Sequence, residues 1–165
     1  MRYIIISLLV LAAFMSCKNT QQSTLQTEND GQPSFSSNHK DSLFMYMNKS
    51  ACLGRCPTYI IKVNHSGKAY LNAKDNLPFK GQFEGQFSDN QLDSIKSWLT
   101  EINYFQLEKV YDAKITDVPA TVTEFHWNDQ HHRVRNRWNG PDELKKFEKY
   151  LHQIILHNAW KYIED

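Results

Sequence analysis

The sequence predicts an α+β domain in which hairpins form an antiparallel sheet and two main helices pack on one face of that sheet. Residues 58–64 and 68–73 are strand-like runs on either side of a short loop that contains Gly67, which is typical of a hairpin. Residues 121–127 and 131–138 form a second pair of this kind. A segment with helical periodicity follows each pair, and helices in that position are expected to cover a sheet.

The other extended segments are less regular. Residues 42–48 place large side chains on both faces and are expected to form a buried strand. Residues 82–87 favour a further short strand, which Gly85 weakens because glycine has no side chain to pack. We expect a turn at residues 128–130 inside the second hairpin and a long connection at residues 108–119.

Each predicted helix has a start signal and an apolar stripe. Ser88 and Gln91 have the spacing of a capping box, in which the two side chains bond to each other's backbone amides. The second helix is expected to open at Pro141, with acidic residues near the positive end of its dipole. The two stripes are Leu92, Ile95, Leu99 and Ile102 in the first helix, and Leu144, Phe147, Leu151 and Ile154 in the second.

Residues 1–16 have the layout of a secretory signal peptide, in which Arg2 precedes an apolar run. The run has about 14 residues, whereas a membrane-spanning helix needs about 20. Residues 14–17, Phe-Met-Ser-Cys, resemble a bacterial lipobox, in which the sulfur of Cys17 is lipidated and acyl chains such as palmitate anchor the protein. The alternative is cleavage by an ordinary signal peptidase, which leaves Cys17 unmodified.

A polar segment at residues 17–40 is expected to be a flexible tether, because it has too few apolar side chains to offset the entropy of ordering. Residues 41–165 would then form a single domain outside the cytoplasm. The predicted location is the cell envelope of a Gram-negative-type bacterium, with the lipid in the inner or outer membrane. The membrane is thus the first expected partner.

The composition excludes several classes of protein. The 165 residues contain 19 Lys and Arg against 18 Asp and Glu, so no charge excess favours nucleic acid as a partner. The mean hydropathy of -0.61 excludes a protein that crosses the membrane many times. The sequence has no P-loop, no G-x-S-x-G, no H-E-x-x-H and no dinucleotide fingerprint. It therefore predicts no catalytic residues and no cofactor, and an enzyme is the less favoured hypothesis.

Two cysteines lie between predicted strands. Three residues separate Cys52 from Cys56, whereas a thioredoxin-type pair has two between its cysteines. Two close thiols tend to pair in an oxidising envelope, so the first hypothesis is a structural disulfide that pins the loop. The alternatives are a redox-active pair, with Arg55 stabilising a thiolate, and a metal site completed by histidines.

The same loop carries a Cys-x-Gly-x-Cys-Pro-x-Tyr pattern, formed by Cys52, Gly54, Cys56, Pro57 and Tyr59. With this pattern the chain resembles a family of envelope lipoproteins that carry a domain of unknown function. The similarity covers about residues 42–157 and continues through Gly67, Phe105, Tyr111, residues 116–119, Leu144 and Leu151. The resemblance implies a small domain outside the cytoplasm and a Cys52–Cys56 pair, and it implies no activity, substrate or cofactor.

A row of basic residues is the first candidate binding surface. Arg133, Arg135 and Arg137 would share one strand face with His131, because side chains alternate along a strand. Guanidinium groups bind carboxylates and phosphates, so an anionic envelope polymer or a lipid headgroup is a possible ligand. The alternative is a solvated face on which Glu124 pairs with an arginine.

Further candidates lie in loops. Arg55 and Tyr59 of the cysteine loop are expected contacts for an envelope protein. Asp117, in a polar loop, is a candidate base or ligand, although aspartate in a loop more often caps a turn.

Histidines at positions 126, 131 and 132 cluster around one predicted turn, with Asp129 as the obvious additional ligand. A metal would need further ligands in three dimensions, so no metal site is predicted. The leading hypothesis is a non-catalytic binding or interaction domain. A thiol–disulfide protein using Cys52 and Cys56 and a metal-binding sensor are the alternatives.

Overall fold

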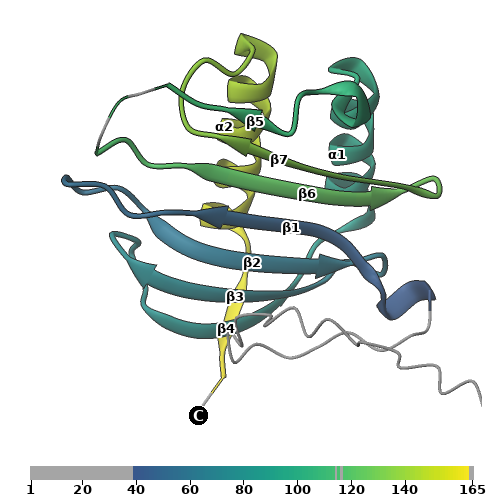
Figure 1. Cartoon of the computed structure of the whole chain (residues 1–165). Coiled ribbons are helices and arrows are strands. Elements are labelled where there is room, and N and C mark those ends of the chain that lie inside the picture. The colour runs from purple at the N-terminus through teal and green to yellow at the C-terminus, as the bar shows by residue number, and fades with distance from the viewer. Residues whose placement is uncertain (1–38, 114, 116, 164–165) are drawn as a thin grey trace, which may run out of the picture. The chain divides into compact units, whose positions relative to one another are not determined.

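An eight-stranded sheet with two α-helices forms the part of the chain that the structure describes (Figure 1). The computed structural model describes residues 39–113, 115 and 117–163, all within the unit Gly31–Asp165. The strands are β1 (Leu43–Lys49), β2 (Thr58–Asn64), β3 (Lys68–Asp75), β4 (Gly81–Gln86), β5 (Val110–Tyr111), β6 (Thr121–Trp127), β7 (Gln130–Asn136) and β8 (Trp160–Tyr162). The helices are α1 (Asp89–Glu101), α2 (Asp142–His157) and two 3-10 turns at His39–Asp41 and Tyr104–Gln106.

The strand order is β5-β7-β6-β1-β2-β3-β4-β8, and the pairing is antiparallel except between β5 and β7. The predicted mixed α+β class and the mostly antiparallel sheet are therefore confirmed. The strand expected at residues 58–64 has the same bounds as β2, and the predicted strands at residues 42–48 and 82–87 correspond to β1 and β4.

Glycine and asparagine close the hairpin between β2 and β3. Gly67 has φ of +83°, and a Cβ at that position would lie 2.4 Å from the carbonyl oxygen of Phe87. The buried side chain of Asn64 accepts hydrogen bonds from the backbone amides of Ser66 and Lys68, at 3.1 and 2.8 Å. The turn therefore needs glycine for its conformation and asparagine for its hydrogen bonds.

The second hairpin is tighter than the sequence predicted. Asn128 and Asp129 both have positive φ, at 50° and 57°, and form a two-residue turn between β6 and β7. Such a turn suits the twist of paired strands, and asparagine and aspartate tolerate this conformation. The expected turn at residues 128–130 was one residue too long, because Gln130 already pairs with Trp127.

Two edge strands were not predicted. β5 lies inside the segment expected to be a plain connection and pairs in parallel with the end of β7. β8 follows α2 and pairs with β4. The second hairpin strand was also expected to run to residue 138 but ends at Asn136, so Arg137 lies just beyond β7.

The helix starts follow their sequence signals to different degrees. In α1 the amide of Gln91 donates to Ser88 Oγ at 3.3 Å and the amide of Ser88 donates to Gln91 Oε1 at 2.8 Å, which confirms the capping box. In α2 Pro141 is the N-cap residue, and no side chain of the described residues caps that end.

The apolar stripe of α2 is displaced from the predicted one at its C-terminal end. Leu144, Phe147 and Leu151 are buried as expected, but the fourth buried apolar residue is Ile155 rather than Ile154. Glu148 is also buried on this helix, which the apolar pattern did not predict.

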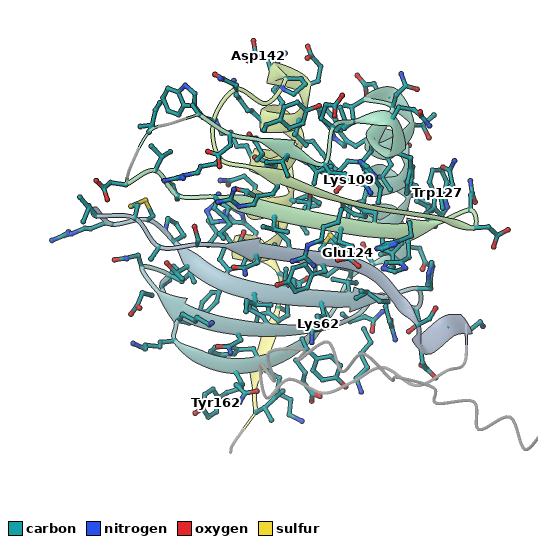
Figure 2. The ribbon with its side chains drawn as sticks, viewed as in Figure 1. Lys62, Lys109, Glu124, Trp127, Asp142 and Tyr162 are labelled. Atoms are coloured by element: carbon teal, nitrogen blue, oxygen red, sulfur yellow. A yellow bond between two sulfur atoms is a disulfide. The ribbon has the colours of Figure 1, made fainter. Side chains whose placement is uncertain are left out.

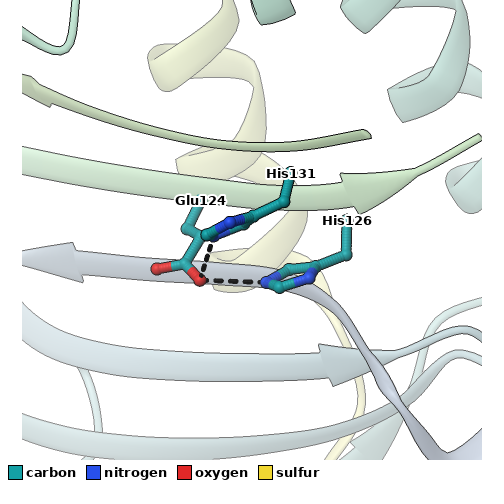
Figure 3. Close-up of side chains that lie close together, drawn as sticks. All are labelled: Glu124, His126 and His131. Carbon is teal, nitrogen blue, oxygen red and sulfur yellow. Dashed lines mark hydrogen bonds and ion pairs between the residues drawn. The ribbon is translucent and has the colours of Figure 1, made fainter. Parts of the chain in front are cut away.

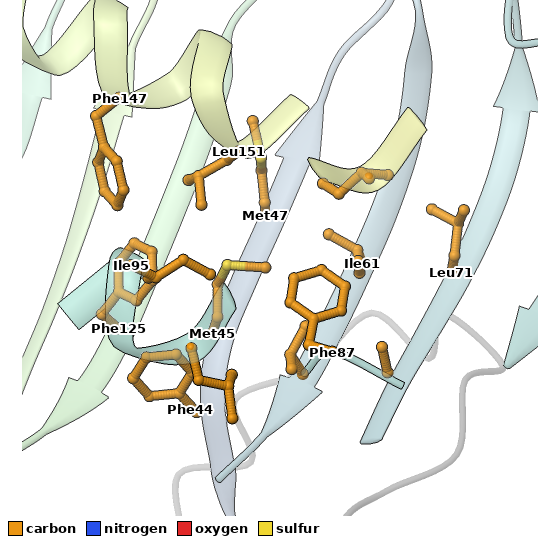
Figure 4. Packing of buried hydrophobic residues seen from close by; sticks show 14 of the residues in the cluster. Phe44, Met45, Met47, Ile61, Leu71, Phe87, Ile95, Phe125, Phe147 and Leu151 are labelled. Atoms are coloured by element: carbon orange, nitrogen blue, oxygen red, sulfur yellow. The ribbon is translucent and has the colours of Figure 1, made fainter. Parts of the chain in front are cut away.

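Strand and helix side chains share one hydrophobic cluster (Figure 4). Met45 and Met47 of β1 belong to it together with Ile95 of α1. At its aromatic part the ring of Phe125 lies 4.9 Å from that of Tyr104 and 5.6 Å from that of Phe147, measured between centroids. This cluster holds β6 and α2 together and so fixes the position of the residues that β6 carries.

Candidate metal centre

Glu124, His126 and His131 lie side by side on the neighbouring strands β6 and β7 (Figure 3). The Nε2 atoms of His126 and His131 each lie 2.9 Å from Oε1 of Glu124. The two imidazole rings stack with their centroids 4.2 Å apart. Both imidazole nitrogens therefore converge on one carboxylate oxygen.

Strand geometry and turn length create this arrangement. Glu124 and His126 are two residues apart on β6, so their side chains project from the same face of the sheet. The two-residue turn sets the register in which His126 pairs with His131 and Glu124 pairs with Arg133. A turn one residue longer would place His126 opposite His132 instead, and His131 would leave the group.

Glu124 is the best-shielded member of the group. Its side chain is 14% exposed, compared with 36% for His126 and 57% for His131. Arg133 Nη1 lies 2.7 Å from Glu124 Oε2, and the same guanidinium lies over the ring of Tyr46. Arg133 thus holds the carboxylate oxygen that the histidines do not contact.

Hydrogen bonds keep Glu124 ionised. Burial on its own raises the pKa of this carboxyl, but the hydrogen bonds from His126, Arg133 and His131 outweigh burial and hold the pKa below its ordinary value. The carboxylate is therefore available as a metal ligand at neutral pH. Arg133 would weaken the binding of a cation, because it adds a positive charge beside the group.

This donor set suits zinc. Two imidazole nitrogens and one carboxylate oxygen are a recurring set of zinc ligands, with a water molecule in the fourth position. The three ligand atoms lie within 4.8 Å of one another. Ligand atoms around a tetrahedral zinc lie about 3.3 Å apart, given metal–ligand bonds of about 2.0–2.1 Å. To admit the ion, the side chains would have to rotate out of their present hydrogen-bonded contacts, and each ligating Nε2 would have to be the unprotonated nitrogen of its ring.

The membership of the group differs from the sequence expectation. His132 was expected to join the other histidines, but its Nε2 lies 2.8 Å from the carbonyl oxygen of Leu107 and its ring packs edge-on against Tyr104. The sequence predicted no metal site and offered Asp129 as the obvious candidate for a further ligand, but Asp129 lies in the turn, and the carboxylate in the group is that of Glu124. The signal that identifies Glu124 is its i,i+2 spacing from His126 within a strand.

Carboxylates accompany all three arginines of the predicted binding row. Arg133 pairs with Glu124, as the alternative hypothesis expected. Arg135 Nη1 lies 2.9 Å from Asp112 Oδ2, and its hydrogen bond lowers the pKa of Asp112. Arg137 lies 3.7 Å from the other oxygen of Asp112. An anionic polymer would have to displace these carboxylates to reach the guanidinium groups.

Two other predicted contact residues have different environments. Tyr59 is fully buried, so the expectation that it contacts a partner is wrong; its hydroxyl lies 3.0 Å from Nδ1 of His152. It belongs to the core because alternation along β2 turns it inward with Ile61. Asp117 is exposed and has φ of +67°, and Thr116 before it lies outside the described residues.

A disulfide joins Cys52 and Cys56, with their Cα atoms 5.8 Å apart. The carbonyl oxygen of Cys56 accepts hydrogen bonds from Asn76 Nδ2 at 3.1 Å and from Thr58 Oγ1 at 3.2 Å. The loop is thus tied to β2 and to the segment after β3. Arg55 is exposed on it.

Replacing Cys52 and Cys56 together by serine is expected to lower the free energy of unfolding by about 2 kcal/mol. The bond closes a loop of very few residues, so it removes only modest entropy from the unfolded chain. Urea denaturation of the variant and of the oxidised parent checks this. A loss several times larger would mean that the bond supports more of the fold than its own loop.

The predicted signal peptide, lipidated Cys17 and tether lie outside the described residues. Among residues 39–113, 115 and 117–163, no helix combines the length and the apolar character needed to cross a membrane.

A family model described as "Domain of unknown function (DUF6438)" matches residues 44–155 of the chain. No curated protein matches the chain at a significant level, and no solved structure does so either.

Proposed function

The chain belongs to this DUF6438 family of domains of unknown function, and we propose that it is a lipid-anchored protein of the bacterial cell envelope that binds zinc through Glu124, His126 and His131. The observation that carries the proposal is the convergence of both Nε2 atoms on one carboxylate oxygen, at 2.9 Å each. This function is consistent with a sequence that predicts no catalytic residues, because the reversible binding of an ion requires no catalytic group.

An open sheet face is part of this proposal. We infer that both helices cover one face and that the zinc ligands lie on the other. Met45 and Met47 share the core with helix side chains, whereas Tyr46 between them pairs directly with Glu124 and Lys62. Directly paired residues project to the same side of a sheet. Figure 2 labels Glu124 and Lys62 on this proposed face.

Zinc titration by calorimetry tests the site. The parent is expected to bind one zinc ion, and His131→Ala is expected to weaken binding by more than about tenfold, because it removes one of three ligands. His157→Ala is the matched control, since His157 is an exposed histidine of α2. Equal affinities for the parent and the His131 variant would refute the site.

The affinity for zinc is expected to fall when the pH is lowered to about 5, because protons compete with the ion for imidazole nitrogens. Calorimetry of the parent across this range checks the dependence. Elemental analysis of protein purified from native membranes extends the test, and zinc should be retained. Affinity that does not change with pH would point to carboxylate ligands without histidine.

The lipid anchor is a separate part of the proposal. It is supported by the apolar leader, the lipobox-like residues 14–17 and the polar segment that follows. Mass spectrometry of the native protein is expected to find Cys17 at the N-terminus with a diacylglycerol on its sulfur. An intact Met1 would contradict both the anchor and the envelope location.

The disulfide loop supports a second function, contact with an envelope protein. Leu53 is 84% exposed on a loop held by the Cys52–Cys56 bond, so a large apolar side chain is presented on a constrained backbone. A photo-crosslinker at position 53 is expected to capture a protein in native membranes, whereas one at Lys149 on α2 is not. Capture of nothing but the lipoprotein itself would argue against this function.

A redox role for the same cysteines is the remaining alternative. The reduction potential of the pair separates the two hypotheses. A structural bond is expected to have a potential below about -300 mV, while values near about -120 to -200 mV belong to thiol–disulfide enzymes.

A further inference from the structure

A recess lies between the loop before β6, the end of β7 and the first turns of α2. Its volume is about 410 Å³, which is enough for a ligand of amino-acid size. It shares no residue with the zinc ligands. Asn136 and Glu148 line it and are only 7% and 8% exposed, so they form its closed inner end.

Two acceptor atoms at this inner end have no partner among the described residues. Asn136 Nδ2 donates to Glu148 Oε2 at 3.1 Å, but Asn136 Oδ1 and Glu148 Oε1 accept no hydrogen bond. A buried acceptor without a donor carries a free-energy cost, which is larger when the acceptor is charged. A ligand that brings a hydrogen-bond donor, above all a cationic one, would remove this cost after a small side-chain adjustment.

The outer part of the recess has the opposite charge. Lys145 and Arg137 line it together with the apolar surfaces of Pro119 and Trp138. Lys145 Nζ forms an exposed ion pair with Asp142 at 3.2 Å and also attracts Glu148 electrostatically, and exposed pairs contribute little and re-form easily. Trp138 is 48% exposed, so its ring is accessible to an apolar group.

We propose that this recess binds a small zwitterion, an apolar amino acid, with its ammonium group at Glu148 and Asn136 and its carboxylate at Lys145. A cation alone would meet the two basic side chains, and an anion alone would leave both buried acceptors unpaired. The apolar surfaces accommodate the side chain of the ligand.

Calorimetry of the full chain in detergent tests the proposal with three probes. L-phenylalanine carries both charges, phenethylamine carries only the ammonium group, and 3-phenylpropanoate carries only the carboxylate. L-phenylalanine is expected to bind saturably, and each single-charge probe at least about tenfold more weakly.

Variants identify the site. Glu148→Gln is expected to weaken the binding of L-phenylalanine and phenethylamine but not that of 3-phenylpropanoate. Lys145→Gln is expected to weaken the binding of the two probes that carry a carboxylate, L-phenylalanine and 3-phenylpropanoate. Lys149→Gln, an exposed lysine of the same helix, is the matched control. Because His131→Ala changes only zinc binding, failure here is distinguishable from failure of the zinc site.

The proposal is overturned if L-phenylalanine does not bind saturably, if 3-phenylpropanoate binds as tightly as L-phenylalanine, or if Glu148→Gln leaves all three affinities unchanged. The Lys145 variant keeps the test decisive if the Glu148 variant folds poorly.

Discussion

Replacing Phe147 by alanine is expected to lower the free energy of unfolding by about 3–5 kcal/mol. Phe147 is fully buried on α2, where its ring stacks at 5.7 Å from Trp98 of α1 and at 5.6 Å from Phe125 of β6. Truncation removes the side chain that joins both helices to the sheet and leaves a cavity. Equilibrium denaturation in urea measures the change.

Two further variants separate packing from helix propensity. Phe147→Leu keeps most of the volume and is expected to cost much less than the alanine variant. Lys146→Ala changes the exposed neighbour on the same helix turn and is expected to have almost no effect. A loss below about 1 kcal/mol for Phe147→Ala would contradict the packing of α2 described above.

Replacing Glu148 by glutamine is expected to stabilise the protein at pH 8 by an amount on the order of 3 kcal/mol. Burial raises the pKa of Glu148 from 4.5 to about 7. Between these values the folded state binds a proton that the unfolded state has lost, so stability falls as the pH rises through this window. The amide of glutamine can accept the hydrogen bond from Asn136 without carrying the buried charge.

His152 opposes this trend in the parent protein. Burial lowers the pKa of His152 from 6.5 to about 4, so the unfolded chain binds a proton first and stability falls as the pH drops through that range. Between pH 4.5 and pH 6.5 both groups change the stability, and their effects have opposite signs: with rising pH, Glu148 lowers the stability and His152 raises it. The parent should therefore show little pH dependence there and lose stability from pH 6.5 to 7 and slightly above.

Chemical denaturation at a series of pH values tests both groups. Glu148→Gln is expected to abolish the loss of stability above pH 6.5. The variant should also show the rise in stability that His152 causes as the pH increases from about 4. Glu143→Gln, an exposed position on α2, is the control and should follow the parent. A Glu148 variant that is less stable than the parent at pH 8 would contradict the assigned burial of a charged carboxylate.

The helices and the longer strands could be predicted because the periodic spacing of their apolar residues extends over many positions. The capping box at Ser88 and the stripe of Leu92, Ile95 and Leu99 identify α1, and alternation identifies the longer strands. β5 and β8 have two and three residues, too few to show a period, and they pair only because a neighbouring edge is available. Their existence is a tertiary effect.

The buried carboxylate on α2 illustrates a second limit. The apolar pattern suggested Ile154 as the last member of the stripe, but the helix turns Ile155 inward and buries Glu148 as well. Asn136 accompanies Glu148 from the end of β7, twelve residues earlier in the chain. No local sequence pattern shows that Asn136 will lie beside Glu148 in the folded protein.

Whether the sequence reveals the proposed zinc ligands depends on the length of a single turn. The histidines near the turn are visible in the sequence, but a three-residue turn at residues 128–130 would pair β6 and β7 in the wrong register. With the two-residue turn at Asn128 and Asp129, His131 faces His126 and Glu124 faces Arg133. Adjacent asparagine and aspartate between two strands are a signal for that shorter turn.

Nuclear magnetic resonance of the ring nitrogens during a zinc titration tests the central claim most directly. The protein has seven histidines, and each gives separate signals once its side chain is isotope-labelled. One equivalent of zinc is expected to shift the Nε2 signals of His126 and His131 and to leave those of His132 and His152 unchanged. Unchanged signals for His126 and His131, or larger shifts at other histidines, would contradict the proposed site.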